Sequence, residues 1–393
     1  MIANPIKNEE HIFWMGIKES EIHACDGFFE GAVTFFGGNS TNRSFSNIHN
    51  KILNTSIPTK EQTDFFIGQA KQIIKENEKN SLMFYSPGKW VFALDDTTMA
   101  RCLCMNDKTV LDNTSNKFYM FELLQGKVPC LERVYLEKED CSFSTVSESF
   151  FSDSFVIQEQ TGAGGSGTML YNRENCEELY CCLDDGKIYT ISKYCDNCIP
   201  INTHCIIGDQ EALLFPPSIQ IIVIEDNHFN YKGADFIGYR GISKNLQEKT
   251  EAYSIQVCDA LREVGYRGIV GIDYIVYQNE VFFIEVNNRF QASSSLLNKA
   301  LKEHGLPTLQ EMNLHCFRGT LGGLQVSKKD LSFDVPYSCF IFKHSESDLA
   351  NIGIEPVLVF FDGYDSNKEI EDNAYMYTHI FNQSIYEAFR AIA

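Results

Sequence analysis

The feature that most constrains this chain is a pattern of two short apolar runs between residues 265 and 291. Ile272 to Tyr277 and Val281 to Val286 are rich in β-branched and aromatic residues, and the polar segment Gln278-Asn279-Glu280 separates them. A short polar interruption between two strand-like runs is typical of a tight turn. The pattern therefore predicts a β-hairpin.

Three oxygen-bearing side chains are expected to converge on one face of this hairpin. Glu285 and Asn287 are two residues apart in the second strand, so they point the same way, and Asp273 lies opposite them on the first strand. Mg²⁺ prefers such oxygen ligands and keeps its remaining positions for water and substrate phosphates. Arg289, two residues further along, adds a fork-shaped cation for a phosphate or carboxylate.

An exposed hairpin with an ordinary polar face is the alternative interpretation of this segment, because Asp and Glu are common on exposed surfaces. Glu285, however, is embedded in the strongly apolar sequence Phe282 to Val286. A carboxylate in such surroundings needs a partner, since burying an unpaired charge is costly. The sequence therefore favours a metal site formed by Asp273, Glu285 and Asn287.

A second motif is glycine-rich, with four glycines between Gly162 and Gly167. Glycines allow positive φ and a close approach of backbone N–H groups to an anion, and Ser166 and Thr168 add hydroxyl donors. No Gly-Lys-Ser/Thr follows, as a Walker A loop would require, and no helix pattern opens after it, as a dinucleotide fingerprint would. The motif predicts a mobile loop that covers phosphates, and a flexible hairpin turn is the alternative.

Composition excludes several classes of partner. The 33 Lys and Arg against 53 Asp and Glu give a formal net charge of −20, which argues against nucleic acid and anionic membranes as partners. The sequence shows no signal-peptide pattern and no apolar stretch of roughly 18 residues, so a cytoplasmic protein is expected. In that compartment the 14 cysteines are expected to be reduced.

Short β-rich runs alternate with helix-like segments, which is typical of a mixed α/β chain. Strands are expected at residues 82–85, 90–94, 155–158, 219–224, 281–286, 333–342 and 354–361. Helices are expected at residues 61–77, 116–125, 248–264 and 293–304.

Taken in order, the glycine loop near residue 165, a hinge-like segment near residue 195 and the Asp273 to Arg289 hairpin resemble the ATP-grasp superfamily over roughly residues 113–301. The hairpin spacing is similar to that of the biotin carboxylase branch. The resemblance implies an α/β (α+β) fold in which two α+β subdomains clamp ATP, with one or two Mg²⁺ ions or, alternatively, Mn²⁺. The implied parts are a pre-ATP-grasp α/β domain (1–112), an N-terminal subdomain with the glycine loop (113–192), a C-terminal subdomain with the metal site (193–325) and a closing subdomain (326–393).

The resemblance also implies which residues contact the nucleotide. Lys117 resembles the lysine that reaches the phosphates, and together with Arg289 it is the implied catalytic residue; a solvated lysine at a helix start is the alternative. The family usually has a second phosphate lysine where Gln158 stands, and a glutamine supplies no charge. Lys193 and Lys232 are the candidate replacements.

The hinge supplies the remaining nucleotide contacts that the resemblance implies. Backbone groups of Lys193 and Cys195 are expected to hydrogen-bond the adenine, and Asn202 is expected near the ribose or the metal. The full set of implied nucleotide-binding residues is Lys117, Gln158, Gly164, Gly165, Ser166, Gly167, Thr168, Lys193, Cys195 and Asn202. A zinc site of Cys195, Cys198, His204 and Cys205 is disfavoured, because a strand over 201–207 would send His204 and Cys205 to opposite faces.

The activity implied by the resemblance is an ATP-dependent ligation. A substrate carboxylate would be activated as an acyl phosphate and coupled to an amine of the amino-acid or peptide type, with release of ADP and phosphate. A carrier-protein phosphopantetheine thiol is the alternative acceptor, although the acidic chain is a poor match for an acidic carrier protein. A nucleotide-binding regulatory protein without turnover is the alternative outside the enzymes, and relatives are commonly homodimers.

Overall fold

The computed structural model describes residues 10–36, 60–88, 90–150, 152–162, 167–343, 353–362 and 376–390. Its N-terminal part is a parallel sheet of β1 (His11–Lys18), β2 (Gly31–Phe36) and β3 (Asn80–Phe84) in the order β2-β1-β3. Helix α1 (Lys60–Glu76) packs on this sheet through Phe66, Ala70 and Ile73, which share one apolar stripe. Because the strands are parallel, their carboxyl ends meet at one edge, and Tyr85 follows β3 there.

A short helical segment connects this sheet to the next part of the chain. It contains η3 (Val91–Ala93), α2 (Asp96–Met99) and α3 (Lys108–Thr114), whereas the 3₁₀ turn η1 (Glu19–Ile22) lies earlier, between β1 and β2. The strand expected at residues 90–94 was wrong, because this stretch is the 3₁₀ turn η3. Its sequence lacks strand alternation, and the Trp90 ring packs edge to face on both Phe66 and Phe84.

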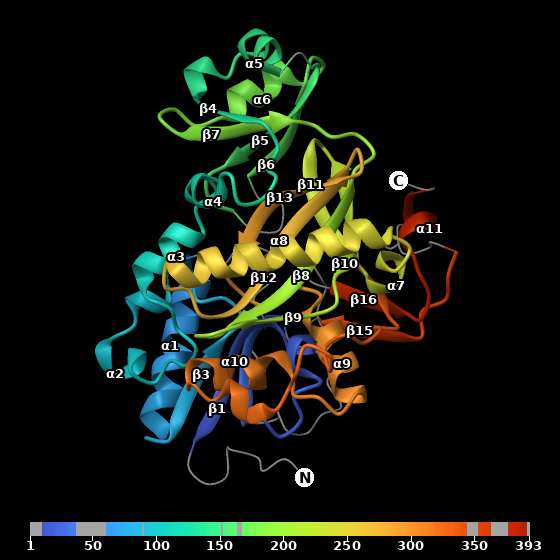
Figure 1. Cartoon of the computed structure of the whole chain (residues 1–393). Helices are drawn as coiled ribbons and strands as arrows, with labels where there is room; N and C mark the ends of the chain where they lie inside the picture. Colours follow the sequence, from blue (N-terminus) through green and yellow to red (C-terminus); the bar gives the residue numbers. More distant parts are fainter. Residues whose placement is uncertain are drawn as a thin grey trace.

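The second part, green in Figure 1, is a small α+β layer. Its sheet contains β4 (Arg133–Glu137), β5 (Ser154–Glu159), β6 (Thr168–Asn172) and β7 (Ile188–Lys193) in the order β6-β5-β7-β4. The helices of this region are α4 (Lys117–Leu124), η4 (Lys138–Asp140), α5 (Phe143–Phe150) and α6 (Cys176–Cys182). Phe155, Ile157 and Tyr171 bury the inner face of the sheet against α5 and α6.

The central sheet continues from this layer in the order β13-β12-β8-β10-β11. Its strands are β8 (Ile199–Ile207), β9 (Ala212–Leu214), β10 (Ser218–Glu225), β11 (His228–Asp235), β12 (Gly268–Tyr277) and β13 (Glu280–Asn287). Its helices are α7 (Phe236–Tyr239), α8 (Lys244–Glu263), α9 (Ser294–Glu303), α10 (Leu309–Phe317) and the 3₁₀ turn η5 (Leu321–Leu324). Figure 1 shows α8 crossing one face of this sheet, while α9 and α10 pack with Ile206 and Ile269 in a separate core cluster.

Three further strands extend the sheet beside β11. They are β14 (Ser338–Lys343), β15 (Leu358–Asp362) and β16 (Met376–Phe381), and α11 (Tyr386–Arg390) follows them. The expected strand at residues 333–342 begins only at Ser338, because Pro336 cannot donate to a ladder and the stretch before it is irregular. Asp235, fully buried, holds α11 by accepting hydrogen bonds from Ser384 Oγ (2.6 Å) and the backbone amides of Ile385 (2.8 Å) and Tyr386 (3.0 Å).

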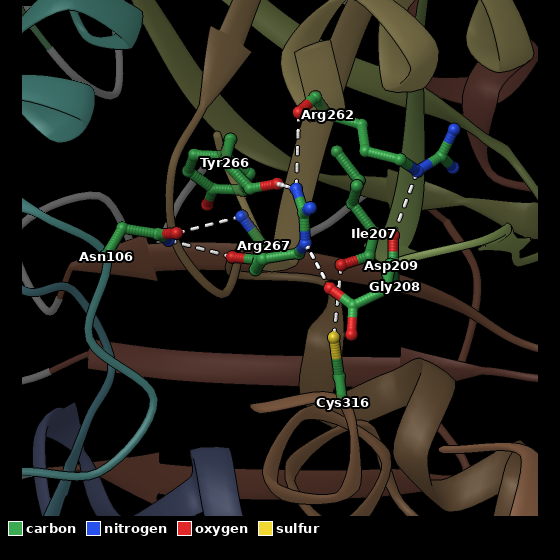
Figure 2. A network of polar contacts seen from close by, with 8 residues as sticks. All are labelled: Asn106, Ile207, Gly208, Asp209, Arg262, Tyr266, Arg267 and Cys316. Carbon is green, nitrogen blue, oxygen red and sulfur yellow. Dashed lines mark hydrogen bonds and ion pairs between the residues drawn. The ribbon is translucent and has the colours of Figure 1, made fainter. Parts of the chain in front are cut away.

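The connection between the N-terminal part and the central sheet is fixed by a polar network, which Figure 2 shows. Asn106 pairs with the backbone of Arg267 at both ends of its amide: Nδ2 donates to the carbonyl and Oδ1 accepts from the N–H, each at 2.8 Å. Arg267 Nε donates to Asp209 Oδ1 at 2.7 Å, and Arg262 Nε donates to the Gly208 carbonyl at 2.9 Å. The segment before α3 is therefore attached to the loops at the end of β8 and the start of β12.

The other expected strands and helices agree with the described structure to within a few residues at their ends. Within the described residues, no helix combines the length and the apolar character needed to cross a membrane.

Candidate active site

The hairpin that the sequence predicts is formed by β12 and β13. Its two-residue turn contains Gln278 (φ 49°) and Asn279 (φ 63°), and both positive angles are typical of the turn that matches the twist of an antiparallel pair. Asp273 lies directly opposite Glu285, and a register irregularity follows immediately after Asp273. The prediction that Asp273, Glu285 and Asn287 come together is confirmed by their hydrogen bonds.

Asp273 is the centre of this group. Asn202, its neighbour on β8, donates from Nδ2 to Asp273 Oδ1 at 2.5 Å, and Asn287 Nδ2 donates to Asp273 Oδ2 at 2.9 Å. The Gln220 side chain on β10 also hydrogen-bonds Asp273. Burial, followed by the negative charge of Glu285, raises the pKa of Asp273 to about 7.

Glu285 has the opposite electrostatic environment. Lys117 Nζ, at the start of α4, lies 3.1 Å from Glu285 Oε2, and the two side chains are only 7% and 17% exposed. Burial acts to raise the pKa of Glu285, but the charge and hydrogen bond of Lys117 outweigh it and hold that pKa below its usual value. Two adjacent carboxyl groups with pKa values pushed apart are typical of functional sites.

Arg289 follows the last residues of β13 and lies beside the same cluster. Its Nη2 donates to Asn287 Oδ1 at 3.0 Å, and its Nη1 donates to the Phe290 carbonyl at 3.0 Å and to Tyr85 Oη at 3.2 Å. The guanidinium is therefore fixed in orientation by three acceptors. A fixed, planar cation next to a carboxylate cluster can bind a phosphate or carboxylate through its remaining donors.

The side chains of this cluster fit a divalent cation that takes oxygen ligands. Asp273 and Glu285 supply carboxylates, and Asn287 and Asn202 supply amide oxygens. Asn202 Oδ1 is buried without a hydrogen-bond partner among the described residues. A cation there would also relieve the repulsion between Asp273 and Glu285, and Mg²⁺ is commonly held by one or two carboxylates with water and phosphate.

The predicted phosphate-contacting residues lie on adjoining elements. Gln158 on β5 is buried opposite Thr168 on β6, with Nε2 3.4 Å from Thr168 Oγ1. Lys117 N donates to the Gln160 carbonyl at 2.8 Å, so α4 begins against the strand end that precedes the glycine loop. Gly167 has φ 71°, as expected of a glycine turn. Gly164, Gly165 and Ser166 lie outside the described residues.

The predicted hinge residues lie directly after β7. Lys193 is the last residue of β7, and its side chain is exposed. Cys195, two residues later, is buried. Lys232, the other candidate cation, is buried on β11 with its Nζ 3.5 Å from Glu225 Oε2. Whether any of these residues contacts a nucleotide stays a prediction.

The cysteines near the hinge do not form a zinc site with His204. Among the described residues there is no group of three or more His, Cys, Asp or Glu side chains that could hold a metal ion. A metal ion at Asp273 would therefore need amide oxygens as ligands in addition to the two carboxylates. His204 lies fully buried with Nε2 3.1 Å from Ser294 Oγ, whereas Cys205 packs in the apolar cluster under α8. Their opposite faces follow from strand alternation in β8, as the sequence indicates.

Two participants of this site were not predicted from the sequence. Tyr85 bonds Arg289 from the N-terminal sheet, and Gln220 bonds Asp273 from β10. Neither belongs to a local motif, because each is brought to the hairpin only by packing of distant segments.

Comparison with known proteins identifies the domain that carries this site. The model of the ATP-grasp domain family matches residues 114–293. A search of curated proteins finds no match to the sequence.

Solved structures share the fold over nearly the whole chain. One is a carboxyaminoimidazole ribonucleotide synthase from Aspergillus clavatus complexed with ATP, with 13% identity, TM-score 0.61 and coverage of 98% of this chain and 96% of that one. Another is an L-amino acid ligase from Bacillus licheniformis, with 10% identity, TM-score 0.59 and coverage of 98% and 96%. A third is the biotin carboxylase domain of a 2-oxoglutarate carboxylase from Hydrogenobacter thermophilus, in complex with MgADP, ADP and bicarbonate, with 12% identity, TM-score 0.65 and coverage of 96% and 87%. Residues 114–293 are thus similar to the ATP-grasp domain family, and the chain shares its fold with these enzymes.

Proposed function

We propose that the protein is a Mg²⁺-dependent ligase that uses ATP to activate a substrate carboxylate as an acyl phosphate and couples it to an amine, releasing ADP and phosphate. The observation that carries the proposal is the buried group of Asp273, Glu285 and Lys117 within the ATP-grasp domain. A protein that only folds around an apolar core has no need of two adjacent buried carboxyl groups, because burying them is costly.

Asp273, Glu285 and Asn287 are the proposed metal ligands, with Asn202 beside them. A bound Mg²⁺ would neutralise charge that develops on the transferred phosphoryl group. Mn²⁺ has a similar preference for oxygen ligands and is an alternative metal. One or two such ions are proposed.

Lys117 and Arg289 are the proposed catalytic residues. Lys117 is held at the carboxylate group from α4, and Arg289 is held there from the end of β13, so the two cations approach the site from different elements. Both would steady the phosphoryl group as it moves from ATP to the carboxylate, since cations aimed at developing charge lower the barrier.

The nucleotide is proposed to bind between residues 113–192 and residues 193–325, with residues 1–112 and 326–393 completing the enclosure. Lys193 and Cys195 would contact the adenine through their backbones. Gln158, Thr168 and the glycine loop would cover the phosphates and exclude water, which acyl phosphates require because they hydrolyse. Lys193 or Lys232 would supply the charge that Gln158 lacks.

The acceptor is proposed to be an amine of the amino-acid or peptide type. Support comes from the fold shared with an L-amino acid ligase and from the acidic surface, which would repel an acidic carrier protein. A carrier-protein thiol and a nucleotide-binding role without turnover are the two alternatives that an experiment must distinguish.

The test is ADP and phosphate release from the purified protein with ATP and Mg²⁺ against pools of amino acids, with mass spectrometry of the products. The proposal expects ADP release that depends on substrate and a product mass equal to two substrates minus water. ADP release only with a phosphopantetheinylated carrier protein would establish the thiol acceptor instead. ATP binding without ADP release in any pool would establish the role without turnover.

A further inference from the structure

Tyr85 connects the N-terminal sheet to the segment that follows the β12–β13 hairpin. It is buried at the carboxyl edge of that sheet, directly after β3. Its backbone N–H donates to the Met15 carbonyl at 2.9 Å, which extends the pairing of β3 with β1. Its carbonyl accepts a hydrogen bond from Phe290 N at 3.1 Å. The backbone of Tyr85 therefore joins two segments separated by about half of the chain.

The side chain of Tyr85 acts on the residue next to Phe290. Arg289 Nη1 donates to Tyr85 Oη at 3.2 Å, and the guanidinium carbon lies 5.7 Å from the centre of the Tyr85 ring. Burial raises the pKa of the Tyr85 hydroxyl to about 12, so the group is neutral and accepts the hydrogen bond as a phenol. A hydrogen bond from a charged donor is stronger than one between neutral groups.

The other two acceptors of Arg289 belong to its own chain segment. Asn287 Oδ1 and the Phe290 carbonyl are each within two residues of Arg289, so they move with the hairpin end. Tyr85 Oη differs because it is fixed on a separate sheet. It therefore determines how the guanidinium is oriented relative to the N-terminal sheet, which no contact within the hairpin can do.

We infer that Tyr85 is a positioning residue, which orients the Arg289 guanidinium for phosphoryl transfer and makes that orientation depend on the docked N-terminal sheet. The inference rests on the proposed function, since it assumes that Arg289 contacts the transferred group. Tyr85 is assigned no contact with substrate. A misdirected cation loses most of its value in the transition state, because catalysis by charge depends on pre-organised geometry.

The first test compares Tyr85→Phe with the wild type, using the substrates that the ADP-release assay identifies. Removing the hydroxyl leaves the ring and both backbone bonds in place. We expect kcat to fall about 10-fold, while KM for ATP changes less than about 2-fold, because an interaction of the transition state is lost. Tyr266→Phe is the matched control: Tyr266 is also buried, and its hydroxyl donates to the Ile269 carbonyl at 2.6 Å, with no contact to Arg289 among its hydrogen bonds. Its kcat is expected to stay at the wild-type value.

The second test separates positioning from general structural support. Tyr85→Phe is combined with Arg289→Lys, and all rates are referred to the folded protein measured by circular dichroism. If Tyr85 acts through Arg289, the second substitution adds less than about 2-fold to the loss caused by Arg289→Lys. Full additivity, or a Tyr85→Phe rate equal to that of Tyr266→Phe, overturns the inference while leaving the proposed function intact. A wild-type protein without turnover overturns both.

Discussion

Binding of the metal is predicted to depend on pH through Asp273. Its pKa of about 7 means that roughly one tenth of the group is ionised at pH 6 and roughly nine tenths at pH 8. A divalent cation binds the ionised form, and metal binding must displace the proton. The apparent dissociation constant is therefore expected to rise about 10-fold between pH 8 and pH 6. Glu285 does not contribute to this change, because its pKa is held below the usual value.

Mn²⁺ provides a direct assay, because electron paramagnetic resonance measures the free ion in the presence of nucleotide-free protein. Asp273→Asn removes the titrating group, so this variant should bind more weakly and without the change between pH 6 and pH 8. Glu280→Gln is the matched control: Glu280 lies at the turn end of the same hairpin, paired with Lys249, and this variant should keep the pH dependence. A wild-type dissociation constant that is constant from pH 6 to pH 8 would refute the reasoning.

The metal-free protein should show the corresponding effect on stability. A carboxyl group whose pKa is higher in the folded state than its ordinary value of 3.8 stabilises the fold fully below that value, and the contribution disappears as the pH rises through about 7. The free energy of unfolding of the wild type, relative to Asp273→Asn, should therefore fall by about 1.4 kcal/mol per pH unit across this window. A difference between the two proteins that does not change with pH would contradict the assignment of the raised pKa to Asp273.

Three further predictions concern stability. Asn106→Ala removes both bonds to the Arg267 backbone and should cost about 1–3 kcal/mol in urea unfolding; an unchanged midpoint would show that the network in Figure 2 does not hold the connection. Asp235→Asn places an amide donor against the Ser384 and α11 donors, so hydrogen exchange at Tyr386 should accelerate, and equal exchange would reject this anchor. Burial lowers the pKa of His204 to about 3, so this residue stabilises the fold above the ordinary histidine pKa of 6.5, and the contribution is lost as the pH falls toward 3. The unfolding free energy of the wild type relative to His204→Gln should thus drop by about 1.4 kcal/mol per pH unit below 6.5, and a constant difference would contradict it.

The β12–β13 hairpin could be predicted from the sequence because its turn and its two strands are specified by local residues. Two β-branched and aromatic runs joined by Gln278 and Asn279 specify a tight turn, and the turn fixes the register. Counting from the turn alone would place Asp273 opposite Ile284, and the register irregularity after Asp273 places Glu285 there instead. The closeness of the two carboxylates therefore followed from the hairpin, whereas their direct pairing depends on an irregularity that the sequence pattern does not indicate.

The partners of that hairpin could not be predicted, because they come from distant segments. Asn202 reaches Asp273 through pairing of β8 with β12, and Lys117 reaches Glu285 through packing of α4 on β13. Tyr85 lies 204 residues from Arg289. The hydrophobic periodicity of a sequence does not reveal such contacts, since they depend on how complete helices and strands pack against one another. The resemblance to ATP-grasp proteins indicated Lys117 and Asn202 as functional but did not indicate these particular bonds.

The prediction of a strand at residues 90–94 was wrong for a related reason, because here too contacts between distant segments decide the structure. Apolar content around Val91 and Phe92 is compatible with either a strand or a short buried turn. The Trp90 ring fills a space between α1 and β3, and this packing decides in favour of the 3₁₀ turn. Tertiary contacts override local propensity in such short segments.

The measurement that tests the account most directly is ADP formation from ATP and Mg²⁺, with amino-acid pools present, by the wild type and by Glu285→Gln. The substitution keeps the shape of the side chain but removes the charge that faces Lys117 and the proposed metal. We predict substrate-dependent ADP release by the wild type and a loss of about 100-fold or more in a variant that remains folded by circular dichroism. Equal turnover by the two proteins would contradict the assignment of Glu285 as a metal ligand and, with it, the proposed site.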